Sequence, residues 1–193
     1  MGDTFCPAGG FKVSTITRVR CAWGKFRSLL PLLTCRAIPI KRRGKLYLSC
    51  VRSTMLHASE CWALRKEDLN RLIRNERAML RWMCNIQPHL RISIKILYSR
   101  LGIPNLTSAL RLNRLRWFGH VQRSNAWINH ITNFQVDGTR PKGRPKKSWS
   151  DVVREDIAEW YINKESVMDR NIWKENLRLA MKSPTRGNSG QVA

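Results

Sequence analysis

The sequence predicts an all-α protein. Apolar residues recur at intervals of three and four in each periodic segment, the spacing that places them on one side of a helix. No segment alternates apolar and polar residues as a half-buried strand does. Of the 193 residues, 42% are apolar and eight are tryptophan, which indicates a folded chain with a core rather than a disordered one.

Two helices are expected before residue 60, and prolines mark their bounds. The first runs from Ser14, a residue type that caps helix N-termini, to Leu30, and Pro31 breaks it. The second opens at Pro39, because proline suits a first helical position, and its apolar pattern continues towards Trp62.

A cluster of cations occupies the first turns of the second helix: Lys41, Arg42, Arg43 and Lys45. Positive charge is unfavourable at the positive end of a helix dipole, so this cluster is not expected to serve stability. A phosphate clamp or a nuclear-import patch would explain it, and an exposed cluster without a function is the alternative.

The stretch from residue 60 to residue 86 predicts an amphipathic helix. Its apolar residues fall within one arc of the helical wheel: Leu69, Leu72, Ile73, Met79, Leu80, Met83 and Cys84. The opposite arc holds Asn70 and four arginines: Arg71, Arg74, Arg77 and Arg81. A purely cationic face repels itself unless a polyanion lies across it, which favours a phosphate-binding ridge over a solvated surface. Glu76 lies inside the apolar arc, and we expect it to pair with an arginine of a neighbouring helix rather than to act as a general base.

Two more helices are expected before the periodicity ends. A short one spans Ser93 to Leu101 and is stopped by Gly102 and Pro104. A longer one runs from about Asn105 to Arg123. Its candidate phosphate contacts are Arg111 and Arg114.

Three aromatic side chains on these helices could stack on bases: Trp82, Trp117 and Phe118. Aromatic residues at helical spacing are more often part of a core than of a binding surface. We therefore assign all three to the core.

Periodicity stops between about residues 133 and 147, in the linker NFQVDGTRPKGRPKK. Its candidate nucleic-acid-binding residues are Arg140, Lys142, Arg144, Lys146 and Lys147. Gly-Arg-Pro between basic residues resembles an AT-hook, whose extended Arg-Pro strand enters a narrow A·T minor groove. A stiff basic spacer or an import signal is the alternative, because so short a motif also matches by chance.

The remaining residues predict a small helical pair and a tail. Ser148 or Ser150 caps a helix that continues through Trp160, and a last helix spans about residues 167–180. Residues 184–193 are expected to be disordered.

The net charge of +23 indicates an anionic partner, with 36 Lys and Arg against 13 Asp and Glu and a pI near 11.0. Self-repulsion at this level is relieved by counterions or by a polyanion, and a basic domain has the electrostatic character of phosphate binding. No apolar run approaches the ~18 residues of a membrane span, and no signal peptide opens the chain. Nucleic acid rather than a membrane is therefore the expected polyanion.

No motif for catalysis or metal binding is found. The six cysteines include no C-x-x-C pair, and the four histidines lack zinc-ligand spacing, so we expect reduced thiols in an intracellular protein and no metal site. There is no paired-carboxylate motif, P-loop, G-x-S-x-G or H-E-x-x-H. We expect no catalytic residue in this chain.

Several segments carry a resemblance to a known family: ITRVRCAWGKFRSLLPLL, RGKLYLSCVRSTMLHASECWAL, NERAMLRWMCNI, LRWFGHVQR and RPKGRPKKSWSDVVREDI. Each is weak alone, but the set and its order are specific. Together they resemble the C-terminal part of a non-LTR retrotransposon reverse transcriptase of the endonuclease–reverse-transcriptase type, over about residues 2–158.

This resemblance implies a domain organisation. Residues 1–13, with Gly2-Asp3, would be the end of the palm. Residues 14–87 would form a thumb-like helical bundle that grips the template–primer backbone, and residues 88–132 the post-thumb helices. The basic linker at 133–147 and C-terminal helices at 148–183 would complete the nucleic-acid-binding tail.

The resemblance also implies which catalytic parts are missing. The family's catalytic Tyr/Phe-x-Asp-Asp strand and its apurinic-type endonuclease would lie upstream of Met1. Neither that motif nor the Cys/His knuckle of some related elements occurs here. No cofactor is expected in this chain, since Mg²⁺ would serve only a full-length polymerase.

We therefore expect a nuclear, nucleic-acid-binding fragment without catalytic activity of its own. Its partner would be an RNA template, a DNA primer or duplex DNA, and no membrane. Two alternatives stay open. The chain could contribute to DNA synthesis only within a longer polymerase, or it could be a chromatin-associated adaptor that binds DNA through the AT-hook. The sequence leaves the oligomeric state open.

Overall fold

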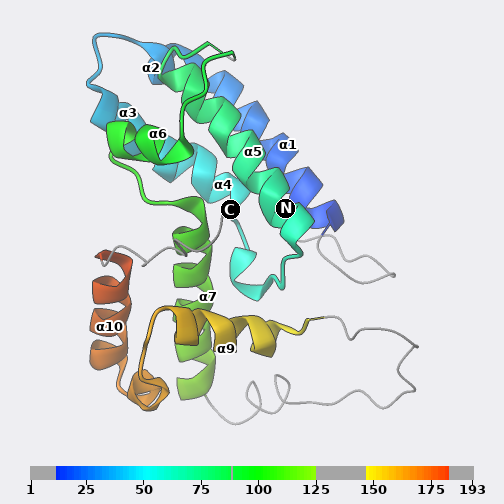
Figure 1. Cartoon of the computed structure of the whole chain (residues 1–193), viewed down its shortest axis with the longest axis vertical. Coiled ribbons are helices and arrows are strands. Elements are labelled where there is room, and N and C mark those ends of the chain that lie inside the picture. Colours follow the sequence, from blue (N-terminus) through cyan, green and yellow to red (C-terminus); the bar gives the residue numbers. More distant parts are fainter. Residues whose placement is uncertain (1–11, 88, 125–146, 183–193) are drawn as a thin grey trace, which may run out of the picture. The chain divides into compact units, whose positions relative to one another are not determined.

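A computed structural model of the chain describes residues 12–87, 89–124 and 147–182 (Figure 1). These residues are helical with short connections and contain no strand, which confirms the all-α prediction. The chain forms two compact units, Met1–Ala109 (unit 1) and Leu110–Ala193 (unit 2). The resemblance placed a domain boundary near residue 87. Unit 1 extends past it because the helix at Ile94–Leu101 packs against other helices of that unit.

Two helices open the described part of unit 1. In α1 (Lys12–Ser28), Ala22 and Phe26 are fully buried. The short α2 (Leu30–Thr34) follows after a single residue. Pro31 lies in the first turn of α2, where its missing N–H breaks no helical hydrogen bond. The expected break before Pro31 is confirmed, but α1 ends at Ser28 rather than at Leu30, and Leu30 begins the next helix.

The next helical segment is continuous but changes its winding. It consists of α3 (Ile40–Leu46), the π-helical turn η1 (Tyr47–Arg52) and α4 (Ser53–Met55). Pro39 was predicted to be the first helical residue. It is the N-cap instead, and the helix begins at Ile40.

This segment ends earlier than the apolar pattern predicted. Ala58 has a left-handed backbone, with φ at 59°, and the short 3-10 turn η2 (Ser59–Cys61) follows it. The chain reversal brings Trp62 into the core, where its side chain is fully buried. The apolar residues near Trp62 therefore continue the pattern because the Trp62 side chain is buried after the turn, and not because the helix extends that far.

The amphipathic stretch forms α5 (Lys66–Met83), so residues 60–65 of that stretch lie outside the helix. Its apolar arc is confirmed as the buried face, because Leu72, Met79 and Leu80 are fully buried. In Figure 1, α5 lies beside α1, and the Nε1 of Trp23 donates to the side-chain oxygen of Asn75 at 3.0 Å between these two helices.

Local capping signals set the bounds of the next two helices. The Ser93 hydroxyl accepts a hydrogen bond from the Lys95 N–H at 3.3 Å at the start of α6 (Ile94–Leu101). Gly102 ends that helix with a φ of 64°, a conformation that glycine adopts without steric cost. The next helix, α7 (Leu106–Arg123), contains the boundary between the two units. Both helices match their predicted spans to within a residue.

Glu76 forms a buried polar cluster in the core of unit 1. Its carboxylate accepts from Arg52 Nε at 2.7 Å and from the hydroxyls of Tyr47 and Tyr98 at 3.2 and 2.6 Å. Burial, and then the neighbouring carboxylate, raise the pKa of both tyrosines, which favours the protonated, donating hydroxyl. The predicted pairing of Glu76 with an arginine of a neighbouring segment is confirmed.

The π-helical turn η1 explains how one segment supplies two of these donors. In a regular α-helix, residues five apart such as Tyr47 and Arg52 would point about 140° away from each other. The i→i+5 bonding of a π-helix, seen here between the Ser53 N–H and the Leu48 carbonyl, brings such residues to the same face. Both side chains can then reach one carboxylate.

Gly44 allows the backbones of α3 and α6 to pack closely against each other. A Cβ at this position would overlap the carbonyl oxygen of Leu101. Gly44→Ala is therefore expected to lower the free energy of unfolding by about 1–3 kcal/mol, measured by urea denaturation. Gly24→Ala is the control, because no atom lies within 4 Å of its added Cβ, and we expect it to stabilise by about 0.5–1 kcal/mol. Equal stability of the two variants would contradict the close packing.

Unit 2 continues with α9 (Trp149–Glu159), the 3-10 turn η3 (Lys164–Met168) and α10 (Arg170–Lys182). Its core brings these elements together with α7 through a cluster of buried residues: Leu115, Phe118, Val153, Trp160, Ile162, Val167, Trp173 and Leu177. Ser148 is the N-cap of α9 and forms a reciprocal capping box with Asp151. Of the two predicted caps, Ser148 is the one used.

A buried ion cluster joins α7 to α9 within unit 2. Asp156 is 4% exposed, and its two carboxylate oxygens accept from Arg111 Nε at 3.1 Å and Arg114 Nε at 2.7 Å. Arg111 also pairs with Glu159. The cluster fixes the register of the two helices through charge-assisted hydrogen bonds.

Among residues 12–87, 89–124 and 147–182, no helix combines the length and the apolar character that crossing a bilayer requires.

Candidate nucleic-acid interface

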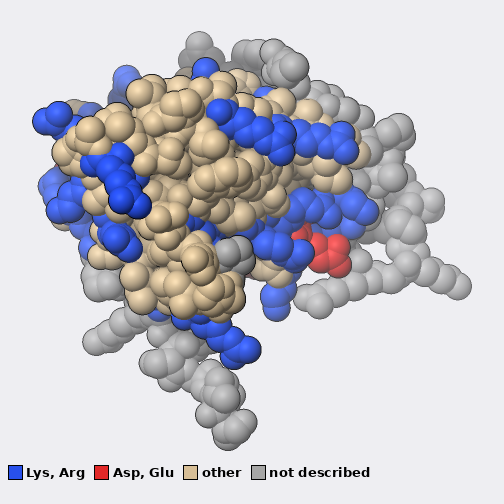
Figure 2. Space-filling model, turned by 90° about the horizontal axis from the view of Figure 1, so that it is seen from above, with Lys and Arg blue, Asp and Glu red and all other residues tan. Residues whose placement is uncertain are grey.

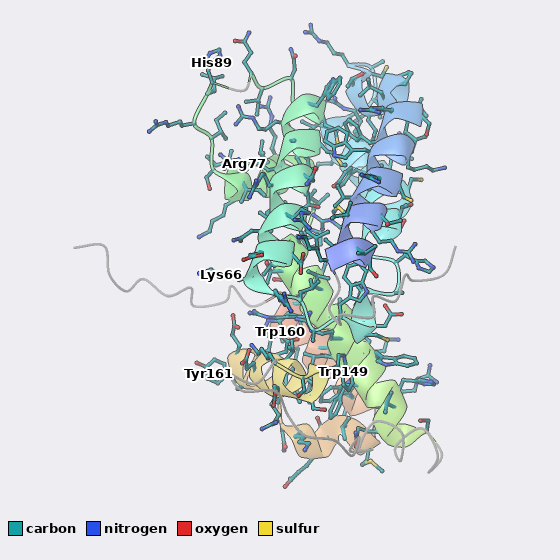
Figure 3. All side chains as sticks on the ribbon, turned by 90° about the vertical axis from the view of Figure 1, so that its right-hand side faces the viewer. Lys66, Arg77, His89, Trp149, Trp160 and Tyr161 are labelled. Carbon is teal, nitrogen blue, oxygen red and sulfur yellow. The ribbon has the colours of Figure 1, made fainter. Side chains whose placement is uncertain are left out.

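The outer face of α5 is cationic, as predicted, but its four arginines are not equivalent. Arg77 donates to the Ile92 carbonyl at 2.7 Å, and Arg81 donates to the carbonyls of Leu90, at 2.9 Å, and Gln87. Figure 3 shows Arg77 between α5 and the segment that carries His89. Arg77 and Arg81 therefore hold the chain that follows α5 against the helix, a structural role that the sequence did not predict.

The other two ridge arginines lie towards the start of α5. Arg71 pairs with Asp68, three residues earlier, at 3.4 Å. Arg74 is exposed, and its guanidinium makes no ion pair with another residue in the described part of the chain. Arg74 is therefore the ridge cation whose charge is most available to a ligand.

An open groove of about 680 Å³ runs beside these arginines in unit 1. Trp23 and Trp82 contribute its aromatic surface, and Arg74, Arg77 and Arg81 lie along it. Trp82 is 51% exposed and contacts Phe26 edge-on, at 5.9 Å between ring centroids. The assignment of Trp82 to the core is therefore wrong: it lies at the edge of the apolar arc, and only part of its indole is covered. Phe118 is buried as expected, and Trp117 is half-buried.

The cation cluster on α3 also divides into two roles. Arg43 donates to the carbonyls of Leu33, at 3.2 Å, and Met83, at 3.0 Å, which end α2 and α5. It therefore neutralises two negative helix ends and is removed from the predicted phosphate clamp. Lys41, Arg42 and Lys45 are exposed, and Lys41 and Lys45 are one helical turn apart.

The contacts of Arg43 bring the α3 cluster to the end of α5 that carries the Trp82 groove. Surface acids are distant from this end. The acids of unit 1 within the described residues are Glu60, Glu67, Asp68 and Glu76. Glu67 and the buried Asp68 lie in the first turn of α5, about 20 Å from Trp82 at the rise of an α-helix. Glu60 precedes that helix, and Glu76 is buried. Figure 2 accordingly shows a face with many Lys and Arg side chains and little Asp or Glu.

Three of the predicted contacts that follow residue 109 pair with acids of unit 2. Arg111 and Arg114 are occupied by Asp156 in unit 2, so we assign them a structural role. Lys147 pairs with Glu155. The other AT-hook residues lie outside the described part of the chain: Arg140, Lys142, Arg144 and Lys146.

The described residues contain no group of three or more His, Cys, Asp or Glu side chains that could hold a metal ion. Cys84 is buried and the Cys61 thiol is exposed, while Cys21, Cys35 and Cys50 are intermediate. Burial raises the pKa of the Cys84 thiol, which disfavours the reactive thiolate. The groove in unit 1 offers the Arg74 guanidinium to an anion and the exposed part of the Trp82 indole to a stacking ring.

Comparisons with protein-family models, curated proteins and solved structures give no match for this chain.

Proposed function

We propose that the chain binds nucleic acid through its phosphate backbone, at the end of unit 1 where α3 and α5 meet. The observation that carries this proposal is a groove in unit 1 whose lining holds Arg74, Arg77, Arg81 and the half-exposed Trp82 and no Asp or Glu. Arg74 is exposed along this groove, and Lys41, Arg42 and Lys45 are exposed on α3, which Arg43 links to the end of α5. Lysine and arginine side chains that neutralise phosphates release the cations condensed on the nucleic acid, which drives association.

Trp82 favours a ligand with an accessible base over an uninterrupted duplex. An exposed indole offers a stacking platform to an unpaired base, whereas the bases inside a blunt duplex are already stacked. A recessed template–primer presents both a duplex backbone and an unpaired strand. The resemblance to the thumb region of a non-LTR retrotransposon reverse transcriptase supports the same ligand, and we propose that the chain serves as such a nucleic-acid-gripping fragment without catalytic residues of its own.

The salt dependence of binding tests the proposed contacts. Fluorescence anisotropy with a labelled RNA–DNA template–primer would compare wild type with Lys41→Ala/Arg42→Ala/Lys45→Ala. We expect log affinity to fall linearly with log salt, with a slope shallower by about one for each lost phosphate contact, hence by up to about three in this variant. Trp82→Ala is expected to weaken binding by about 1–3 kcal/mol without changing the slope.

A charge-matched variant provides the control. Arg170→Ala/Lys174→Ala/Lys182→Ala removes three exposed cations from α10, so it changes the net charge equally and should keep the wild-type slope. Equal losses in the α3 and α10 variants would show that total charge rather than this surface governs binding. A wild-type slope in the α3 variant would remove α3 from the interface.

A further inference from the structure

Unit 2 contains a second groove, separate from the surface proposed for nucleic acid. It has a volume of about 900 Å³ and is lined by one face of α7 and one face of α10. The α7 lining runs from Leu112 through Arg116 and His120 to Arg123, positions one helical turn apart. At the rise of an α-helix this lining is about 16 Å long, or three turns.

The groove has an apolar floor and a cationic rim. Leu112 and Met181 provide most of the accessible apolar surface, and Trp173 and Leu177, each 2% exposed, also line the groove. Cations stand along both edges: Arg116 and Arg123 on α7, and Arg170, Lys174, Arg178 and Lys182 on α10. No Asp or Glu lines it. Within the described residues, Arg116, Arg170, Lys174 and Lys182 form no ion pair, so their charges are available to a ligand.

The walls of the groove are held in place by packing and hydrogen bonds. The Trp173 indole donates to the Leu115 carbonyl at 3.0 Å, and a side chain at Gly119 would overlap the same indole. Arg123 donates to the Val167 carbonyl at 2.6 Å. The spacing of α7 and α10 is therefore fixed without any ligand, so little ordering would be needed on binding.

We propose that this groove binds an acidic amphipathic helix of a partner protein. Charge complementarity requires an anionic ligand, and the apolar floor requires one that also buries hydrocarbon. An amphipathic helix meets both requirements, because apolar residues at i, i+4 and i+7 can lie on the floor while Asp or Glu beside them reach the rim. A phosphodiester backbone supplies only the charge and would leave Leu112 and Met181 uncovered. A three-turn lining matches the short helices that bind in this manner.

Peptide binding to the full chain tests this inference. The probe is a fluorescein-labelled helical peptide of about 16 residues, with leucine at i, i+4 and i+7 and glutamate on the flanking positions. A control peptide has the same sequence with lysine in place of every glutamate. We expect anisotropy to show saturable binding of the glutamate peptide and none of the lysine peptide.

Variants assign that binding to the groove. Arg170→Ala/Lys174→Ala/Lys182→Ala should weaken peptide binding about tenfold or more, from the loss of three rim charges. Met181→Gln should weaken it about threefold to tenfold by making the floor polar, without changing any charge. Lys41→Ala/Arg42→Ala/Lys45→Ala should bind like wild type, because none of these residues lines the groove.

Three results would overturn the proposal: equal weakening in the α3 and α10 variants, unchanged binding in Met181→Gln, or tight binding of the lysine peptide. A fourth result would reassign the groove to nucleic acid. In that case the α10 variant would show a reduced salt slope for template–primer binding while its peptide binding stayed unchanged. Because the two triple variants are compared with both ligands, this inference and the nucleic-acid proposal can fail independently.

Discussion

Glu76→Ala is expected to destabilise unit 1 by about 3–5 kcal/mol, the loss that follows when one partner of a buried ion pair is removed. Glu76 is fully buried, and the side chain of Arg52 is only 4% exposed. The substitution would leave the Arg52 charge without its counterion and the hydroxyls of Tyr47 and Tyr98 without their acceptor. Urea denaturation would give the total loss, and hydrogen exchange of the α5 amides would assign that loss to unit 1.

Two further variants separate burial from charge. Glu67→Ala removes an exposed acid from the first turn of the same helix and should cost no more than about 1 kcal/mol. Arg52→Met/Glu76→Leu removes both charges and should be clearly more stable than Glu76→Ala, because no uncompensated charge stays in the core. A cost below about 1 kcal/mol for Glu76→Ala would contradict the buried cluster.

Asp156→Ala is expected to destabilise unit 2 by a similar amount, about 3–5 kcal/mol. This carboxylate accepts from two arginines, and the side chains of Arg111 and Arg114 are 14% and 8% exposed. Losing the carboxylate would leave the largely buried Arg114 without the acid it pairs with, while Arg111 would keep only Glu159. Hydrogen exchange should show the loss in α7 and α9, while the protection of α5 is unchanged.

The control for Asp156 is Asp151, an acid on the same helix whose side chain is 40% exposed. Asp151→Ala removes half of the capping box with Ser148 and should cost about 0.5–2 kcal/mol. If Asp156→Ala costs no more than Asp151→Ala, the ion cluster does not organise unit 2.

Features that depend on local chemistry were predicted from the sequence. Ser93 and Gly102 bound α6, and Ser148 with Asp151 begins α9, because caps satisfy backbone groups only a few residues away. The pairing of Glu76 was also predictable, since an acid in an apolar arc must find a counter-charge. The particular arginine was not, because Arg52 reaches Glu76 only through the π-helical turn.

Features that depend on distant backbone could not be predicted. Arg43, Arg77 and Arg81 have the same side chain as Arg74, but they donate to carbonyls that the fold brings close to them. Periodicity assigns a residue to a helix face and does not show which acceptors lie opposite that face. The same reason explains why Trp82 was misassigned and why Asp156 was not singled out as the centre of an ion cluster.

The central claim, that the chain grips nucleic acid through the surface where α3 and α5 meet, is tested most directly by one comparison. The full chain would be titrated into a labelled, recessed RNA–DNA template–primer and into a blunt duplex of equal length, across a salt series. We expect linear salt dependence for both ligands and tighter binding of the template–primer, whose unpaired bases can stack on Trp82. No measurable binding to either ligand at about 50 mM salt would contradict the claim.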